Sequence, residues 1–176
     1  LVSLCVSAIS LLIGGSLASI ITCTDIPARK FISFCILVPY MLPSSYNALS
    51  WITIFKNDRI GGYPGFLQAI FHINPPNWLS YGFLPIVLTL SVHYYAFAYL
   101  LISSALSSMG GDLEEMGEIV GATRFQILRR ITFPLILPAV LSSFILTFSR
   151  AIGTFAVPAF LGLKINFYTI STMLYS

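Results

Sequence analysis

Residues 112–138 read Asp-Leu-Glu-Glu-Met-Gly-Glu-Ile-Val-Gly-Ala-Thr-Arg-Phe-Gln-Ile-Leu-Arg-Arg-Ile-Thr-Phe-Pro-Leu-Ile-Leu-Pro, and this stretch decides the fold of the chain. It holds four of the six acidic residues and three of the nine basic residues. Apolar runs long enough to cross a bilayer flank it on both sides. A charged segment between two such runs has to lie in water at one membrane surface. The stretch therefore predicts a transmembrane helix bundle with a folded element on one side of the membrane.

The first half of this stretch carries the signals of a short helix. Asp112 followed by Glu115 has the spacing of a capping box, so a helix is expected to start near residue 113. Gly121 is a natural end for that helix, because glycine adopts the left-handed conformation of a helix C-terminus at little cost. We therefore expect a short helix followed by a tight turn at Gly121.

The second half repeats the pattern. Thr123 followed by Gln126 again has capping-box spacing, so a second short helix is expected over roughly 124–130. The acidic residues lie at the start of the first helix and the arginines toward the end of the second, and both placements suit the helix dipole. Two interpretations stay open from the residues alone. The stretch is either a docking element for a partner or a solvated helix-turn-helix without one, because a charge run is usually a solvated face.

The composition is that of a membrane protein. Hydrophobic residues make up 57% of the chain and charged residues 9%, with a mean hydropathy of +0.89, whereas about a quarter of a soluble domain is charged. The net charge is only +3 and the basic residues lie at the ends of apolar runs, so nucleic acid is not an expected partner. The two histidines lack metal-ligand spacing and no Cys-x-x-Cys occurs, so neither a metal nor another cofactor is expected.

The apolar runs predict an all-α, polytopic transmembrane helix bundle that occupies 1–176 as one partial domain. We expect spans at about 1–23, 31–55, 82–108 and 133–157, the start of another near 167–176, and a polar loop at 112–134. Arg29 and Lys30 place the turn after the first span in the cytoplasm by the positive-inside rule. Counting spans then puts the polar loop in the cytoplasm and the Gly- and Pro-rich segment 56–81 outside. Pro39 and Pro43 are expected to kink the second span.

Polar side chains within the spans are candidates for a translocation pathway. They are Asn47, His93 and Arg150. An arginine near a helix centre costs about 2.5–3.5 kcal/mol on insertion scales, so Arg150 is expected to face the bundle interior or a water-filled vestibule, the alternative being that it snorkels outward. An ionisable side chain such as His93 at this depth is a functional-site hypothesis by default, although a neutral histidine bonded to a neighbouring helix is also open. No residue pattern indicates a catalytic site.

The spacing of the polar stretch resembles the coupling motif of permease subunits of type-1 ABC importers. The matching residues are Glu115, Gly121, Ile131 and Pro134. Met116 and Gly117 stand where that family usually has alanines, and Phe133 stands where it usually has leucine. The resemblance implies that two short helices dock in a cleft of a cytoplasmic ATPase. The residues expected to couple to the ATPase are Glu115, Met116, Gly117, Gly121, Ala122, Ile131 and Pro134.

Two further segments resemble the ferric iron, thiamine and polyamine branch of that family. One is the turn at 24–30 followed by a span with two prolines. The other is 151–175, where the resemblance lies in Gly153, Pro158, Gly162 and Tyr168. The likeness covers nearly the whole chain. Because the chain opens inside an apolar run without methionine and closes near the start of another, we expect it to be a fragment of a longer permease.

The resemblance implies a permease subunit of an ATP-driven importer, a multi-pass protein of the inner or plasma membrane of a bacterial cell. Such a subunit is not itself an enzyme, since ATP is hydrolysed on a separate subunit, and this sequence has no Gly-x-x-x-x-Gly-Lys motif. The implied partners are cytoplasmic ABC ATPase subunits, an extracytoplasmic substrate-binding protein, a second permease half or subunit, and membrane lipid. The branch that it resembles imports iron, a polyamine or thiamine, but phosphonate and sugar importers share the architecture, so the sequence does not name the substrate.

Two other classes of function share the oily composition. A channel or secondary transporter would also tolerate Arg150 in a span, but it has no need of the folded polar stretch. An intramembrane enzyme would need clustered acids, a nucleophile with a base, or metal ligands at a membrane face. His93 has no acid near it in the sequence, and the acids of 112–118 have no histidine partner. The polar stretch therefore favours the permease.

Overall fold

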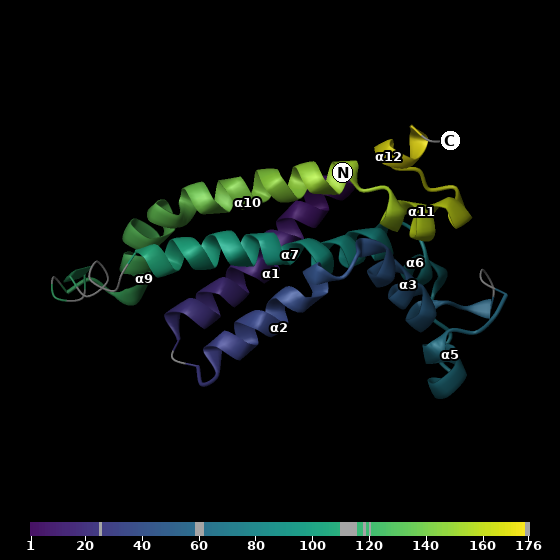
Figure 1. The fold of residues 1–176 in the computed structure, drawn as a ribbon, viewed down its shortest axis with the longest axis horizontal. Coiled ribbons are helices and arrows are strands. Elements are labelled where there is room, and N and C mark those ends of the chain that lie inside the picture. Colours follow the sequence, from purple (N-terminus) through teal and green to yellow (C-terminus); the bar gives the residue numbers. More distant parts are fainter. Residues whose placement is uncertain (25, 59–61, 110–115, 118, 120, 175–176) are drawn as a thin grey trace.

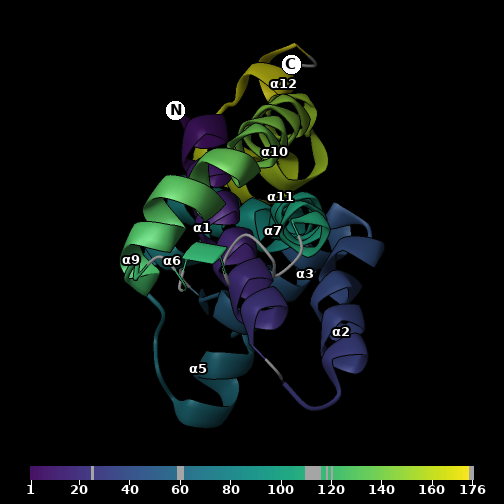
Figure 2. The ribbon, with the colours of Figure 1, turned by 90° about the vertical axis from the view of Figure 1, so that its left-hand side faces the viewer.

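The computed structural model describes residues 1–24, 26–58, 62–109, 116, 117, 119 and 121–174, apart from the side chain of Arg124. Over these residues the chain is helical without strands, which confirms the all-α fold class. Figure 1 shows the long helices side by side, and Figure 2 looks along them. By length and composition, three of the described helices could each cross a membrane: Val2–Cys23, Asn77–Ser108 and Phe125–Gly153.

Helices α1 (Val2–Cys23) and α7 (Phe83–Ser108) form the centre of the bundle. The buried face of α1 carries small side chains, among them Ser7, Ser10, Gly14 and Ala18. A Cβ atom on Gly14 would lie 2.4 Å from the Tyr95 carbonyl oxygen, so the two backbones touch at this glycine. Close packing through small residues is how helices associate in lipid, because an apolar side chain gains little there by moving from lipid to protein.

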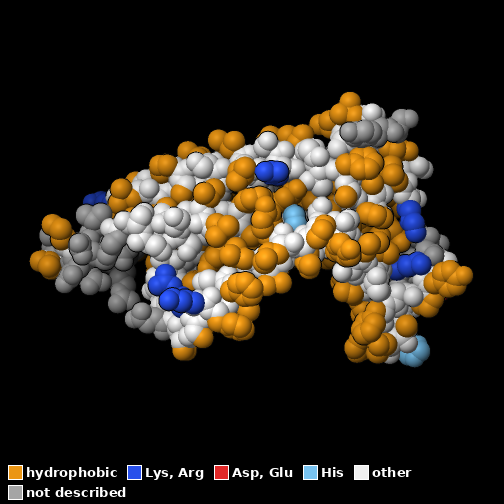
Figure 3. All heavy atoms as spheres, viewed as in Figure 1, with side chains coloured by type: hydrophobic (Ala, Val, Ile, Leu, Met, Phe, Trp, Pro, Cys, Tyr) orange, Lys and Arg blue, Asp and Glu red, His pale blue; other side chains and the backbone are white. Residues whose placement is uncertain are grey.

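Helix α10 (Phe133–Gly153) packs along α1 and α7 and completes the core. It continues without a break from α9 (Arg124–Ile127) through a π-helical turn at Leu128–Thr132. The buried core of the bundle includes Val6, Ile86, Leu90, Ile102 and Ile136. Figure 3 shows that hydrophobic side chains also cover the visible outer face of these helices. An apolar surface of this extent is suited to contact with a bilayer rather than with water.

The second expected span, at 31–55, is two helices rather than one kinked helix. Helices α2 (Arg29–Met41) and α3 (Ser44–Phe55) are bent by 88° relative to each other. Leu42 is extended because the residue before a proline is pushed out of the helical region, and Pro43 forms the N-cap of α3. The pair makes a fourth span only if both helices are counted together. The prolines were predicted to kink one helix, and the structure instead has two separate helices at this point.

Short helices gather at one end of the bundle (Figure 1). They are α5 (Phe66–Phe71), α6 (Asn77–Ser80), α11 (Ala156–Gly162), the 3₁₀ helix Leu163–Ile165 and α12 (Ile170–Met173). Hydrogen bonds fasten this end to α3. The Trp51 Nε1–H donates to the Leu79 carbonyl oxygen at 2.9 Å, and the Ser80 hydroxyl donates to the Phe55 carbonyl oxygen at 2.6 Å.

The turn between α1 and α2 lies at the opposite end of the bundle, the same end as α9 (Figure 1). The two segments predicted to be cytoplasmic therefore share one end. The short helices of segment 56–81, which is predicted to lie outside, are at the other. This arrangement agrees with the prediction that the chain crosses the membrane an odd number of times between segment 56–81 and the polar stretch.

The later spans have different bounds from those expected. The helix expected at 133–157 starts earlier, because it is continuous with α9, and it ends at Gly153. Thr154 is extended, and α11 starts two residues later at Ala156. Near 167–176 the described residues form only the short helix α12, which begins with a capping box between Thr169 and Thr172.

Candidate functional site

The polar stretch contains a tight helix-ending turn at Gly121. Met116, Gly117 and Ile119 are helical, and the Ala122 backbone N–H donates to the Gly117 carbonyl oxygen at 3.0 Å. Gly121 has φ +83°, in the left-handed region. A six-residue backbone bond across a left-handed glycine is the Schellman ending of a helix. The predicted stop at Gly121 is confirmed. The predicted cap between Asp112 and Glu115 lies outside the described residues.

The second helix of the stretch begins as the sequence predicts. The Thr123 backbone N–H donates to Gln126 Oε1 at 2.9 Å, and the Gln126 backbone N–H donates to Thr123 Oγ1 at 3.4 Å. These two bonds form the capping box and satisfy backbone donors that a helix start leaves without partners. The sequence alone was sufficient here because both partners lie within one turn of each other.

That helix does not end near residue 130 as expected. It passes through the π-helical turn Leu128–Thr132, in which the Phe133 backbone N–H donates to the Leu128 carbonyl oxygen, directly into α10. Pro134 follows at the first turn of α10, where its ring would crowd a regular α-helical carbonyl and its missing N–H would leave that carbonyl unpaired. A wider turn relieves this conflict. The second helix of the polar stretch and the transmembrane helix are therefore one continuous rod.

The first helix of the polar stretch touches the second at Gly117. A Cβ atom there would lie 3.0 Å from Ile127 Cγ1 and 3.4 Å from Ile131 Cδ1. An alanine methyl would therefore require these isoleucine side chains to shift by a few tenths of an ångström. This packing gives a physical reason for glycine where the resembling family usually has alanine.

A hollow of about 360 Å³ lies beside the turn, lined by Gly121, Ala122, Gln126, Ile127, Arg130 and Ile131. The structure thus brings Gly121, Ala122 and Ile131 of the predicted coupling residues to one surface. Met116 is exposed, and Pro134 lies at the start of α10. Glu115 lies outside the described residues.

Two of the predicted pathway residues meet at the break between α2 and α3. The buried His93 Nδ1 lies 3.3 Å from Asn47 Nδ2 and 3.3 Å from the Pro39 carbonyl oxygen. That carbonyl would pair with the backbone N–H of residue 43 in a continuous helix, but Pro43 has none. One nitrogen cannot accept from Asn47 and donate to Pro39 at the same time, so the tautomer of His93 selects the bond. Contact with a neighbouring helix is what the simpler interpretation of His93 predicted.

Arg150 lies nearer the end of its helix than the sequence predicted, in the last turn of α10. Its side chain is exposed on the surface of this chain rather than buried among these helices, and the predicted water-filled vestibule stays a prediction. The difference in position follows from the earlier start of the helix, which moves its centre toward its N-terminus. The Arg150 backbone carbonyl accepts bonds from the hydroxyls of Thr154 (2.8 Å) and Tyr94 (3.5 Å).

Sequence reasoning missed two tyrosines of α7 that bind α2. The Tyr95 hydroxyl donates to the Ile36 carbonyl oxygen at 2.6 Å, and the Tyr99 hydroxyl donates to Ser33 Oγ at 2.8 Å. The signal available was the presence of phenolic hydroxyls inside a span, since a buried tyrosine hydroxyl usually finds a partner.

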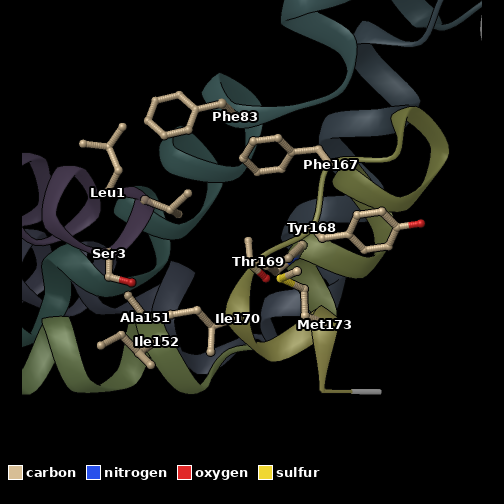
Figure 4. Close-up of a pocket in the computed structure, with 12 residues that line it drawn as sticks. Leu1, Ser3, Phe83, Ala151, Ile152, Phe167, Tyr168, Thr169, Ile170 and Met173 are labelled. Carbon is tan, nitrogen blue, oxygen red and sulfur yellow. The ribbon is translucent and has the colours of Figure 1, made fainter. Parts of the chain in front are cut away.

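An apolar pocket of about 350 Å³ lies toward the end with the short helices, between the start of α1 and the segment that connects α10 to α12. Figure 4 shows Phe83 and Phe167 on one side of it and Ile170 and Met173 on the other. Its lining contains no charged side chain, so it offers no counter-charge to an ionic solute. Among the described residues, no cluster of His, Cys, Asp and Glu could hold a metal ion.

Known permeases resemble this chain over most of its length. The sulfate transport system permease protein CysT of Salmonella typhimurium is 27% identical over 161 residues, which are 92% of this chain and 56% of that protein. The putative ferric transport system permease protein FbpB 1 of Haemophilus influenzae is 32% identical over 117 residues, 66% of this chain and 18% of that protein. The galactooligosaccharides transport system permease protein GanP of Bacillus subtilis is 26% identical over 155 residues, 84% of this chain and 37% of that protein.

The chain spans about half the length of the sulfate permeases that it matches. The relatives include sulfate and sugar permeases as well as ferric ones, so the narrower resemblance to the iron, thiamine and polyamine branch stays a prediction. A known family, described as the binding-protein-dependent transport system inner membrane component, matches residues 3–176. With nearly its whole length matched, the chain belongs to this family of ABC transporter permeases.

Proposed function

We propose that this chain couples a cytoplasmic ATPase to a transmembrane pathway as part of an ATP-driven importer. The observation that carries the proposal is the unbroken helix from α9 through the π-helical turn into α10. A partner that moves the polar stretch would tilt or shift this rod as a unit, because no loop intervenes to absorb the displacement. Family membership argues against an intramembrane enzyme. A channel would not need a polar stretch that is joined rigidly to a transmembrane helix.

The docking surface of this proposal is the turn at Gly121 with its neighbours. Met116 is 62% exposed, and the hollow beside the turn is bounded by the apolar Ile127 and Ile131 and the cationic Arg130. Such a surface suits a partner that inserts an apolar or acidic side chain. We propose that this partner is a cytoplasmic ABC ATPase subunit.

The pathway of this proposal follows the break between α2 and α3. Polar groups of His93 and Asn47 meet there inside an otherwise apolar bundle, and polar atoms at that depth are typical of transport routes. Arg150, exposed on α10 of this chain, would face a second permease subunit or a water-filled vestibule between the two. A substrate-binding protein would deliver the solute at the end that carries α5 and α11.

The relatives carry names for sulfate, ferric and galactooligosaccharide transport, so we propose only a solute delivered by a binding protein. We place the complete protein in the inner or plasma membrane of a bacterial cell. Lipid would cover the outward apolar faces of its helices.

Site-directed cross-linking tests the docking. Met116→Cys in the full-length permease should cross-link to its ATPase subunit in membranes treated with a short bifunctional reagent. Tyr63→Cys is the matched control, because Tyr63 is also well exposed (76%) but lies at the other end of the molecule. Cross-linking from position 63 and none from position 116 would contradict the proposal.

A further inference from the structure

Helix α2 is attached to the bundle in a different way from the other long helices. None of its residues is fully buried, whereas α1, α7 and α10 each bury several. Its apolar contacts come from partly buried side chains such as Ile32, Ile36 and Leu37, so apolar packing holds it less firmly than the other three. Its polar contacts with α7 are the more specific part of the attachment.

These contacts form a ladder. Tyr99 binds Ser33 Oγ at 2.8 Å, Tyr95 binds the Ile36 carbonyl oxygen at 2.6 Å, and His93 lies 3.3 Å from the Pro39 carbonyl oxygen. The acceptors on α2 are spaced three residues apart, which is about 4.5 Å along a helix, and the side chains on α7 run in the opposite direction. The ladder thus follows one edge of α2 over most of its length.

The ladder ends at the break. Leu42 and Pro43 separate α2 from α3, and the carbonyl that the last rung reaches is the one that Pro43 leaves without a helical partner. On the far side of the break α3 is fixed, since Ala48 is completely buried and Trp51 is bonded to the Leu79 carbonyl oxygen. A less firmly packed helix therefore adjoins a fixed one across a bend of 88°.

We propose that Tyr95 and Tyr99 are positioning residues for transport, which latch α2 onto α7 in the conformation seen here. When the latch opens, α2 swings about Leu42 and Pro43 while α3 stays in place. Hydroxyl bonds suit a latch, because each is short and directional, and a single bond between transmembrane helices contributes only modestly to stability. This inference rests on the proposed function, since a swing of α2 matters only if the bundle changes state during transport.

Spin-label distances in the assembled transporter test the latch. One label sits on the native Cys35 of α2 and the other on Ile145→Cys of α10, both exposed, with Cys5 and Cys23 replaced by serine. The Tyr95→Phe/Tyr99→Phe double variant removes both hydroxyls and keeps both rings. Tyr94→Phe is the matched control, since the Tyr94 hydroxyl binds Thr154 near α10 and not α2.

In nanodiscs without nucleotide, we expect one narrow distance distribution for the parent and for Tyr94→Phe. The double variant should show a broader distribution that overlaps the one trapped by ATP and vanadate. A double variant with the distribution of the parent would overturn the latch, even if its melting temperature were lower, because the hydroxyls would then be structural only. Failure of the ATPase to co-purify with the parent would instead overturn the proposed function.

Discussion

Single residues set the closest approaches between helices in this chain. Gly14 lets α1 touch α7, and Gly117 lets the first helix of the polar stretch touch the second. Both contacts join residues far apart in sequence or in adjacent helices, so their partners could not be read from the chain. The turn at Gly121 and the Thr123–Gln126 cap could, because their bonds span only a few residues.

At Gly14 a single methyl group should destabilise the bundle. In Gly14→Ala the new Cβ would meet the Tyr95 backbone, which cannot move aside, and overfilling a packed contact costs about 1–3 kcal/mol. The neighbouring Gly15→Ala is the control, since its Cβ would make only an ordinary contact of 3.4 Å with the Ile102 side chain. Thermal unfolding in detergent should show a lower Tm for the first variant alone. Equal Tm values would mean that α1 and α7 are not packed this closely.

The helices differ from the predicted ones near the prolines, where tertiary contacts decide how each proline is accommodated. Pro39 is accommodated inside α2, whereas Pro43 breaks the chain into two helices. The difference lies in the surroundings, because α3 is docked against the short helices and His93 supplies a bond to the carbonyl freed at the break. Likewise, the second short helix, expected to end near residue 130, continues through a π-helical turn before Pro134 into α10, so Arg150 lies in the last turn of a longer helix.

Removing Pro134 should change how motion passes along the rod. Pro134→Ala supplies the missing N–H and lets the π-helical turn relax to a regular α-helix. Loss of one extra residue in a turn rotates everything before it by about 100° relative to α10. We expect several-fold less transport per ATP hydrolysed, with the protein still inserted. Pro138→Ala, also inside α10 but beyond the π-helical turn, is the control. Equal coupling ratios in reconstituted vesicles would show that the turn is incidental.

The two ends of the molecule are built differently, with the polar stretch and α9 at one end and the short helices at the other. Composition and run lengths were enough to predict the helical fold, the approximate positions of α1 and α7, and which segments share an end. They could not give the orientation of α2 relative to α3 or the tyrosine ladder, because both depend on how helices rotate against one another. Membrane protein sequences fix hydrophobic length much more firmly than they fix helix rotation.

The two ends of the molecule should lie on opposite sides of the membrane. Cysteines at positions 29 and 129 should react with a membrane-impermeant maleimide only after the cells are broken. Those at 62 and 164 should react in intact cells. The reason is that Arg29 and Lys30 begin α2 and Arg129 and Arg130 follow α9, at one end of the bundle, and the positive-inside rule predicts such an end to be cytoplasmic. The native cysteines are removed first. Labelling of position 62 only after breakage would invert the orientation.

Gly121 forms the turn through which the ATPase is proposed to act on the bundle. A valine there has to adopt φ +83°, which costs a β-branched residue at least about 1 kcal/mol and favours opening of the turn. Gly62 is a matched control, because it has φ +75° and equally open surroundings but lies at the other end of the molecule. Strain alone would therefore affect both valine variants alike.

The decisive measurement is the amount of ATPase subunit that co-purifies with each full-length variant, taken together with solute uptake. Gly121→Val should insert normally, lose most of the ATPase and abolish uptake, whereas Gly62→Val should keep both. Full ATPase retention with normal uptake in Gly121→Val would contradict the account, and equal losses in the two variants would do the same.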